Sequence, residues 1–501
     1  MGRRCETGPG SQPPATVSNV PSRRRLVTRA ALCALLVLAS CASPPERTSV
    51  PAPTDADLES ALAPGGGTTS AAAPAPATET ARPSVDPVDG RGLIAASGPT
   101  GLRFLRSDGS EVFAVAADQV VTQPTWSRDG SRLAATLLDP NRGEAWVIVV
   151  DVTTWDVTTA KASRPYFFYT WSYDGSRLAA LGPSPTGGTA ADILDGTGAP
   201  ASGLSLISQS LFVAWEPGGD RLLLHAGHGL LLVNDVDSPD SHHDFGPVGF
   251  DFQAPAWVPG TGDFLYVDSY AQAPIGTEPE ALVDRSATTT PQLLRRSADS
   301  GEITELGPAG AFTLMAVHPT GDRAAISVAE LPPAAAGGSL EAAALEAGQP
   351  AQAEPSVGAG SVQIVDLATA ERRTVIDRIG LWLEWSPDGE RLLIGTSASD
   401  DRESVGLAWY IWDGNELSEL ARFAPTATFF RDYVQFADQY TEAPRLWSPD
   451  STAIAFGAQT ADYAVSAVAQ VEGSGGVTAL GLADVSFWSP VDVDPPPVQP
   501  G

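Results

Sequence analysis

Cysteine is almost absent from this sequence, and its scarcity limits how the chain can be held together. The 501 residues include only Cys5, Cys33 and Cys41, all close to the start. The rest of the chain can therefore form no internal disulfide. Length alone does not give the number of domains, because a chain of repeats grows by adding units.

Positive charge is also scarce. Lys and Arg together number 30 against 60 Asp and Glu, which gives a formal net charge of -30 at pH 7. A chain this acidic repels nucleic acid and anionic lipid headgroups. We therefore expect no nucleic-acid partner.

Two common catalytic motifs are missing as well. A phosphate-binding P-loop needs Gly-Lys-Ser/Thr, but the only lysine, Lys161, lies between two alanines, which excludes nucleotide hydrolysis by that route. No Gly-x-Ser-x-Gly string occurs anywhere in the sequence, which excludes an α/β-hydrolase nucleophile. The sequence therefore predicts no catalytic residue and no cofactor.

The apolar run near the N-terminus, residues 30–39, is far shorter than the ~20 residues that span a bilayer. It follows an Arg-rich stretch and leads into Leu38-Ala39-Ser40-Cys41, as in an export signal. These four residues resemble the lipobox of bacterial lipoproteins. The resemblance implies cleavage after Ser40, a diacylglycerol on the sulfur of Cys41, and anchoring to the cell membrane on its extracytoplasmic side. The alternative is an ordinary signal peptide that happens to contain a cysteine.

Composition divides the remainder of the chain. Residues 22–27, Ser-Arg-Arg-Arg-Leu-Val, resemble a twin-arginine signal, so residues 1–40 are a signal peptide of either export route. Residues 41–88 begin with the lipidated cysteine and are rich in Ala, Pro, Ser and Thr, which predicts a disordered tether. Residues 491–501 are a Pro-rich tail that we also expect to be disordered.

A short pattern recurs through the body of the chain. Two copies are nearly identical, Trp-Ser-Arg-Asp-Gly-Ser-Arg-Leu-Ala-Ala from 126 and Trp-Ser-Tyr-Asp-Gly-Ser-Arg-Leu-Ala-Ala from 171. Further copies begin at Trp215, Trp257, Val317, Trp385 and Trp447. The first four tryptophans are 42 to 45 residues apart, the length of a four-stranded propeller blade.

The pattern resembles the TolB-type propeller repeat, which is related in shape to the WD repeat. The resemblance covers about four-fifths of the chain and implies an all-β fold, a β-propeller of four-stranded blades over residues 89–490. Counting turn-plus-strand starts from Asp89-Gly90 through Asp450-Ser451 predicts eight blades, with seven as the alternative. Each tryptophan ends an extended segment and precedes a tight turn. We expect the small pairs such as Ala134-Ala135 and Ala179-Ala180 to lie on the innermost strands, where blades converge.

Three segments lengthen the repeats, near 271–291, 331–360 and 423–443. Because strands alternate in direction, all three should emerge on the same face of the ring, opposite the Trp-Ser-Pro-Asp-Gly turns. Insertions gathered on one face often mark a binding surface. Neutral growth explains the Ala-rich segment 331–360 equally well.

The last insertion is the best binding candidate, because aromatic residues and an arginine cluster there. They are Phe429, Phe430, Arg431, Tyr433, Phe436 and Tyr440. Such residues often anchor interfaces. The favoured alternative is that they pack on an outer strand, so no binding residue is assigned.

Metal binding is the less favoured interpretation of two polar groups. The five histidines are His225, His228, His242, His243 and His318, and the first two pairs should lie at opposite ends of one blade. His318 replaces the serine of the repeated turn, which indicates a structural variant. The acidic group Asp235, Asp237, Asp240 and Asp244 lacks EF-hand spacing and coincides with a predicted hairpin turn.

The predicted function is therefore that of a membrane-anchored extracytoplasmic lipoprotein. Its propeller would be a non-catalytic platform for an envelope protein, peptide or glycan, and Cys41 is the only site residue predicted. The alternative is an enzyme, a lyase or glycosidase acting on an envelope polysaccharide. That alternative predicts acids and histidines converging at one mouth of the channel.

Overall fold

A computed structural model provides the fold of this chain. The structure describes residues 92–208, 211–226, 229–238, 242–248, 254–268, 291–310, 312–329, 360–398, 406–440, 445–472 and 476–493. The predicted signal peptide, Cys41, the predicted tether, and all but the last residue of each of the insertions 271–291 and 331–360 lie outside the described residues.

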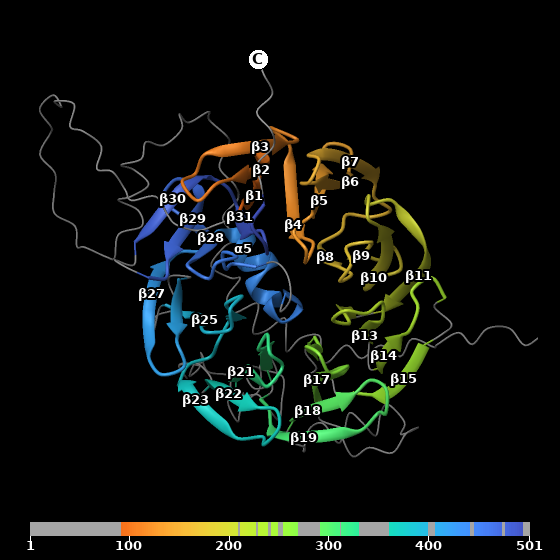
Figure 1. The fold of residues 1–501 in the computed structure, drawn as a ribbon. Helices are drawn as coiled ribbons and strands as arrows, with labels where there is room; N and C mark the ends of the chain where they lie inside the picture. The colour runs from red at the N-terminus through yellow and green to blue at the C-terminus, as the bar shows by residue number, and fades with distance from the viewer. Residues whose placement is uncertain are drawn as a thin grey trace, which may run out of the picture. The chain divides into compact units, whose positions relative to one another are not determined.

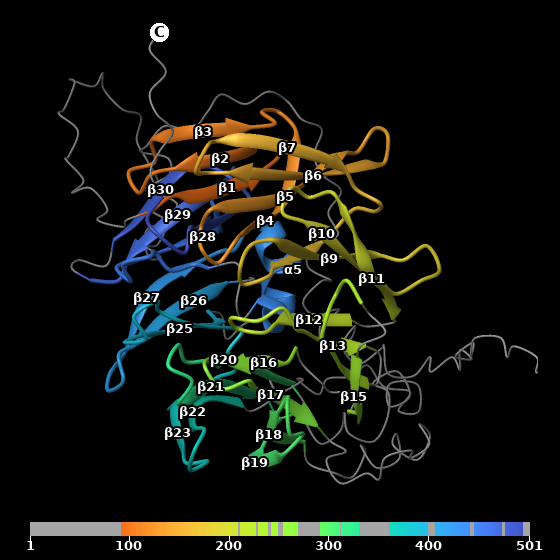
Figure 2. The same ribbon diagram turned by 45° about the vertical axis from the view of Figure 1, so that its right-hand side comes forward.

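The described strands form eight antiparallel sheets, which are the blades of a β-propeller (Figures 1 and 2). Blade 1 contains β31 (Val485–Trp488), β1 (Ile94–Gly98), β2 (Gly101–Leu105) and β3 (Glu111–Val115). Blade 2 contains β4 (Val120–Trp126), β5 (Arg132–Asp139), β6 (Glu144–Asp151) and β7 (Asp156–Lys161). Blade 3 contains β8 (Phe168–Trp171), β9 (Arg177–Pro183), β10 (Thr189–Asp195) and β11 (Pro200–Ser208). Blade 4 contains β12 (Leu211–Trp215), β13 (Leu222–Ala226), β14 (Gly229–Val233) and β15 (His242–Pro247).

The second half of the ring repeats this order. Blade 5 contains β16 (Ala256–Val258), β17 (Asp263–Asp268), β18 (Gln292–Ser297) and β19 (Ile303–Pro308). Blade 6 contains β20 (Phe312–Val317), β21 (Arg323–Ala329), β22 (Gly360–Asp366) and β23 (Arg372–Ile376). Blade 7 contains β24 (Trp382–Trp385), β25 (Leu392–Ser397), β26 (Leu407–Trp412) and β27 (Leu417–Phe423). Blade 8 contains β28 (Ala453–Gln459), β29 (Ala464–Gln470) and β30 (Val477–Leu482).

The ring closes between the two ends of the described chain. The last strand, β31, pairs with β1 from Ile94↔Trp488 to Ser97↔Val485 and so completes blade 1. In blade 8 the innermost position is occupied by residues 445–447, which form isolated bridges to the neighbouring strands instead of a regular strand. The prediction of eight blades is confirmed.

The small alanine pairs do not lie on the innermost strands, so that expectation was wrong. The inner ring is formed by the strands that end in the repeat tryptophan, such as β4 and β8, and the alanine pairs belong to the next strand outward. Ala134 belongs to the same buried cluster as Trp171 of the following blade. The small side chain is needed there because it leaves room for an indole, not because the strand lines the channel.

The repeat tryptophans link neighbouring blades as well as filling space. In six of them the indole N–H donates to a carbonyl on the innermost strand of the preceding blade, which aligns successive blades. The pairs are Trp126 to Phe487, Trp171 to Thr125, Trp215 to Thr170, Trp257 to Ala214, Trp385 to Ala316 and Trp447 to Glu384, at 3.0 to 3.3 Å.

Local hydrogen bonds explain the rest of the repeat. In the Trp126 copy the Ser127 hydroxyl donates to Asp129 at 2.7 Å and accepts from the amide of Arg132 at 2.9 Å, and Gly130 has a φ of 70°. Glycine suits this left-handed position because it has no Cβ. These turns define one face of the ring, which we call the turn face.

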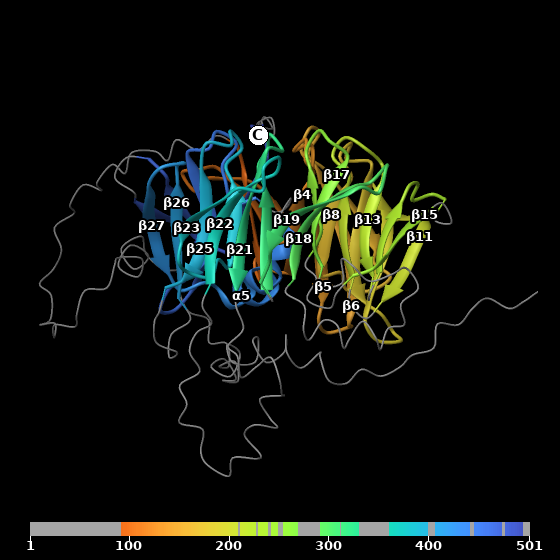
Figure 3. The ribbon, with the colours of Figure 1, turned by 90° about the horizontal axis from the view of Figure 1, so that it is seen from below.

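The connections between second and third strands, and those from one blade to the next, emerge on the other face. The strand ends that flank all three predicted insertions lie there, as predicted, so we call it the insertion face. The third insertion contains α5 (Ala427–Asp432) and the 3-10 segment η1 (Val434–Tyr440). Figure 3 shows α5 at this end of the strands, and Figure 1 places it toward the centre of the ring. In the described part of the chain no helix has the length and apolar character needed to span a bilayer.

Candidate binding site on the insertion face

The third insertion begins as a helix because Thr426 caps it. The Thr426 hydroxyl accepts a hydrogen bond from the amide of Phe429 at 3.0 Å, which satisfies one amide of the first turn. The preceding chain is fixed to blade 8 by the amide of Gln459, which donates to the carbonyl of Ala424 at 2.7 Å. The insertion is therefore positioned by blade 8 as well as by blade 7, from which it emerges.

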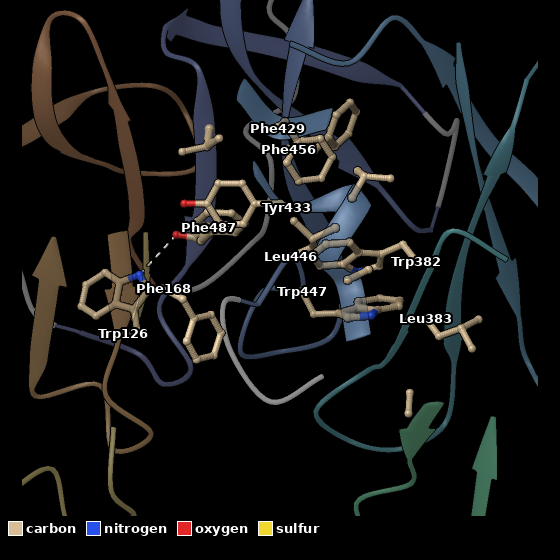
Figure 4. Close-up of a cluster of buried hydrophobic side chains, with 14 of the residues drawn as sticks. Trp126, Phe168, Trp382, Leu383, Phe429, Tyr433, Leu446, Trp447, Phe456 and Phe487 are labelled. Carbon is tan, nitrogen blue, oxygen red and sulfur yellow. Dashed lines mark hydrogen bonds between the residues drawn. The ribbon is translucent and has the colours of Figure 1, made fainter. Parts of the chain in front are cut away.

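One side of the insertion is part of the hydrophobic core (Figure 4). Phe429 and Tyr433 are buried, and the Phe429 ring centroid lies 5.8 Å from that of Trp382 on β24. The Tyr433 ring lies 5.0 Å from Phe487 on β31. Both partners belong to innermost strands, so the expected alternative of outer-strand packing was wrong for these two residues. Nothing in the sequence shows which way an insertion between two blades will fold.

The other side of the insertion faces solvent. Phe436 is 45% exposed, Phe430 is half-buried, and Arg431 is exposed while donating to Asp432 at 2.6 and 2.7 Å. Tyr440 ends η1, and its side chain is outside the described residues. Of the predicted aromatic cluster, Phe429 and Tyr433 are thus buried anchors, and Phe436 is available to a partner.

Exposed aromatic residues are confined to this face within the described part of the chain. Phe167 is 41% exposed and immediately precedes β8, at the strand end that lies on the insertion face. The other large exposed hydrophobic residues are aliphatic, and most lie on outermost strands. They are Val157, Ile207, Ile303 and Val491.

Several carboxylates surround the insertion, each with its own partners. Asp484 accepts from the Thr428 hydroxyl at 3.3 Å, and burial raises the pKa of its carboxyl. Asp438 of η1 is buried and accepts from the amide of Ala254 at 3.4 Å. Asp484 and Asp438 thus lie at the insertion, and each is engaged by its own partner.

Glu384 is the carboxylate with the largest perturbation. It lies on β24 and accepts from the indole of Trp382 at 3.1 Å and from the amide of Leu446 at 3.1 and 3.2 Å. Burial raises its pKa to about 6, and the positive charge of Arg445 partly opposes that rise. The carboxylate thus joins β24 to residues 445–447, the short inner segment of blade 8.

The described histidines lie in blades 4 and 6. His225 is buried on β13 and stacks against Phe212, whereas His242 and His243 are exposed at the start of β15, at the other end of the blade. His228 lies outside the described residues. No group of three or more His, Cys, Asp or Glu side chains in the described ranges is arranged to hold a metal.

His318 is the structural variant that the sequence indicated. It lies in a turn on the turn face, where its Nδ1 contacts the Thr320 hydroxyl at 2.6 Å. Its Nε2 lies 2.8 Å from the carbonyl of Gly389 in the next blade, and burial lowers its pKa. A histidine here joins two blades.

The acidic group in blade 4 is also a turn, as predicted. Asp235 and Asp237 are exposed between β14 and β15, and the Asp235 carboxylate accepts from the amide of Asp237 at 2.9 Å. Asp237 in turn accepts from Arg177 of blade 3 at 2.6 Å. Asp244 lies on β15 and accepts from the amide of Gly246, while Asp240 lies outside the described residues.

Comparison with known proteins gives likeness at the level of fold. No protein-family model matches the chain, and no curated protein matches it. A solved structure of dihydro-heme d1 dehydrogenase NirN is 13% identical, with a TM-score of 0.49 over 90% of this chain and 84% of that one. TolB from Acinetobacter baumannii is 13% identical, with a TM-score of 0.32 over 65% of this chain and 62% of that one. The propeller domain of the Trilobed protease from Pyrococcus furiosus is 11% identical, with a TM-score of 0.43 over 73% of this chain and 99% of that one.

Proposed function

We propose that this protein is a membrane-anchored lipoprotein whose propeller binds a protein or peptide partner through its insertion face, without catalysing a reaction. The observation that supports this most directly is the two-sided insertion. Phe429 and Tyr433 lock it into the ring, while Phe436 of the same segment stays 45% exposed. An aromatic side chain held by a rigid support loses little conformational freedom when a partner covers it.

Charge narrows the kind of partner. With a formal net charge of -30, the chain favours a partner that presents basic side chains, because opposite charges speed association and suppress wrong pairings. An aromatic anchor surrounded by charged residues is a common composition for such an interface. We therefore propose a basic protein or peptide on the extracytoplasmic side of the membrane.

Photocrosslinking tests the binding surface directly. The intact lipoprotein carries p-benzoylphenylalanine in place of Phe436, and a matched form carries it in place of Ile303, which is 42% exposed on the outermost strand β19. Irradiation in the native envelope should give an adduct of discrete mass at position 436 and none at position 303. Phe436→Ser should reduce affinity capture of that same adduct partner at least tenfold, since an interface aromatic commonly contributes more than ~1.4 kcal/mol. Absence of a protein adduct at 436, or equal adducts at both positions, would contradict the proposal.

The proposed anchor is tested at Cys41. In the membrane fraction the N-terminal peptide should begin at Cys41 and carry the added mass of a diacylglycerol. Cys41→Ala should abolish this modified peptide and release a larger share of the protein into the soluble fraction. Unchanged membrane retention of the variant, or an unmodified Cys41 in the natural protein, would refute lipid attachment at this residue.

A further inference from the structure

The interface between blades 8 and 1, where the ring closes, lacks a bond that joins most neighbouring blades. By the pattern of the other repeats, the indole of Trp488 should donate to the inner segment of blade 8. The carbonyl of Leu446 instead accepts from the amide of Ala455 at 2.8 Å. The indole nitrogen of Trp488 is buried and has no hydrogen-bond partner among the described residues. The series of indole bonds therefore breaks at this interface, which we call the seam. It also breaks between blades 5 and 6, where Val317 replaces the tryptophan.

Arginine bridges on the turn face are also interrupted there. Six positions after the repeat tryptophan, four blades carry an arginine that reaches the next blade. The pairs are Arg132 to the Gly175 carbonyl, Arg177 to Asp237, Arg221 to Asp299 and Arg391 to the Ser451 carbonyl. In blade 8 that position is Ala453, which cannot make the bridge to blade 1, and in blade 5 it is Asp263.

Buried polar groups without partners gather on both sides of the seam. Ser486 is two residues before Trp488 on β31, so the two side chains share one side of that strand. Ser466 and Gln470 are each two residues from Val468 on β29 and share its side in the same way. Trp488 and Val468 belong to one buried cluster across the seam, so these polar residues lie on the same sides of their strands. The Ser466 and Ser486 hydroxyls and the Gln470 amide nitrogen have no hydrogen-bond partner in the described structure. Such groups weaken an interface.

The apolar part of the seam is also small. Four of the eight residues in its buried cluster are alanines, namely Ala96, Ala453, Ala455 and Ala483. Alanine buries less apolar surface than the large side chains that pack between blades elsewhere, and the hydrophobic contribution scales with that area. The seam therefore lacks the indole and arginine bonds described above, although Arg103 of blade 1 donates to the carbonyl of Leu482 and the amide of Trp488 donates to the carbonyl of Arg445 across it.

The third insertion lies across this seam and contacts both sides of it. On the blade 8 side, Pro425 bridges to Ala458. On the blade 1 side, the Thr426 hydroxyl donates to the carbonyl of Asp484, the residue just before β31, whose amide donates to Ser97 of β1 at 2.9 Å. The ring contact between Tyr433 and Phe487 adds a second attachment to blade 1. The insertion thus adds bonds between blades 8 and 1, where the indole and arginine bonds are missing.

We propose that α5–η1 is a clasp that keeps the ring closed, and that loosening it opens the seam before any other interface between blades. The missing indole bond, the unpartnered polar groups and the alanine-rich cluster coincide at the seam, whereas the clasp is a separate segment contributed by the connection from blade 7. Opening there exposes the inner strands of blades 8 and 1 while the other six blades stay packed.

Hydrogen–deuterium exchange of the full mature chain measures whether the seam opens before the other interfaces. Thr426→Val is the test variant. In the natural protein, the amides of β31 and β28 should exchange faster than those of β4 and β8. Thr426→Val removes both the helix cap and the bond to Asp484, so exchange in β31 and β28 should accelerate roughly tenfold. Exchange in β4 and β8 should not change.

Thr136→Val is the matched control. Thr136 is equally buried, and its hydroxyl donates across a different interface, to the carbonyl of Tyr166 at 2.9 Å. Thr136→Val should leave exchange at the seam unaltered.

If Thr426→Val fails to fold, Thr428→Val removes only the bond to the Asp484 carboxylate and should give a smaller change of the same kind. The proposal is overturned if seam amides of the natural protein are as protected as those of β4 and β8, if the folded clasp variant accelerates exchange in all blades equally, or if Thr136→Val affects the seam as strongly.

Discussion

Replacing Phe429 with alanine should lower the free energy of unfolding by about 3 to 5 kcal/mol, the range for a fully buried phenylalanine. Phe429 is 0% exposed, and its ring lies 5.8 Å from Trp382, 6.4 Å from Trp409 and 6.2 Å from Tyr433. Alanine would leave a cavity among three aromatic side chains that rigid inner strands cannot easily fill. Urea denaturation followed by tryptophan fluorescence measures the change.

Phe436→Ala is the control for that experiment, because it changes the same residue type in the same insertion. Phe436 is 45% exposed, so its removal should change the free energy of unfolding by less than about 0.5 kcal/mol. Comparing Phe429→Ala with Phe436→Ala therefore distinguishes the buried side of the insertion from its exposed side. Equal effects of the two substitutions would show that the insertion does not pack into the ring as described.

Acidification should stabilise the fold through Glu384. The pKa of its carboxyl is about 6 in the folded state against an ordinary value of 4.5, so the folded state binds the proton more tightly than the unfolded chain. This contribution is fully present below pH 4.5 and is lost as the pH rises through 6. The difference amounts to about 2 kcal/mol in total, of which about 1 kcal/mol should appear between pH 7.5 and pH 5.

Glu384→Gln isolates this contribution from the other carboxyl groups. The turn aspartates Asp129 and Asp174 have lowered pKa values, so they act in the opposite direction and lose stability as the pH falls. The contributions of these two aspartates are present in the natural protein and in the Glu384→Gln variant alike. The free energy of unfolding of the natural protein, minus that of the variant, should therefore rise by about 1 kcal/mol from pH 7.5 to pH 5. A difference that does not change with pH would show that Glu384 titrates normally.

The two faces of the ring differ in the side chains that they present. On the turn face, acids and arginines are engaged in turns and bridges between blades, as Asp129 and Arg132 are. On the insertion face, Phe436 remains exposed above a segment that both blades of the seam contact. A partner bound at Phe436 would therefore lie on the segment that we propose keeps the ring closed.

Repetition made the number of blades predictable. Ser127 and Asp129 form the same turn as Ser172 and Asp174, because each turn depends only on residues within a few positions of the tryptophan. The hairpin turn at Asp366 is equally local, since its carboxylate accepts from the amides of Ala368 and Thr369. Short-range hydrogen bonds of this kind are encoded directly by neighbouring residues.

Contacts between blades were not predictable to the same extent. The indole of Trp171 and the carbonyl of Thr125 are 46 residues apart, and their pairing depends on the angle between two sheets. The expectation that alanines lie innermost was wrong for this reason. A small residue is needed at position 134 because the indole of Trp171 from the next blade packs there. The direction of the third insertion likewise depends on Trp382 and Phe487, which are distant in sequence.

The sequence by itself determined the repeat, its eight copies, the turn chemistry and the face on which the insertions emerge, because all of these follow from short-range hydrogen bonding and strand alternation. It also contains the signal-like segment and Cys41, from which the membrane anchor is proposed. Only the tertiary structure decided which aromatic residues are buried, which strand is innermost and which blades the third insertion contacts. Those outcomes depend on contacts between side chains from separate blades, and no local sequence pattern specifies such contacts.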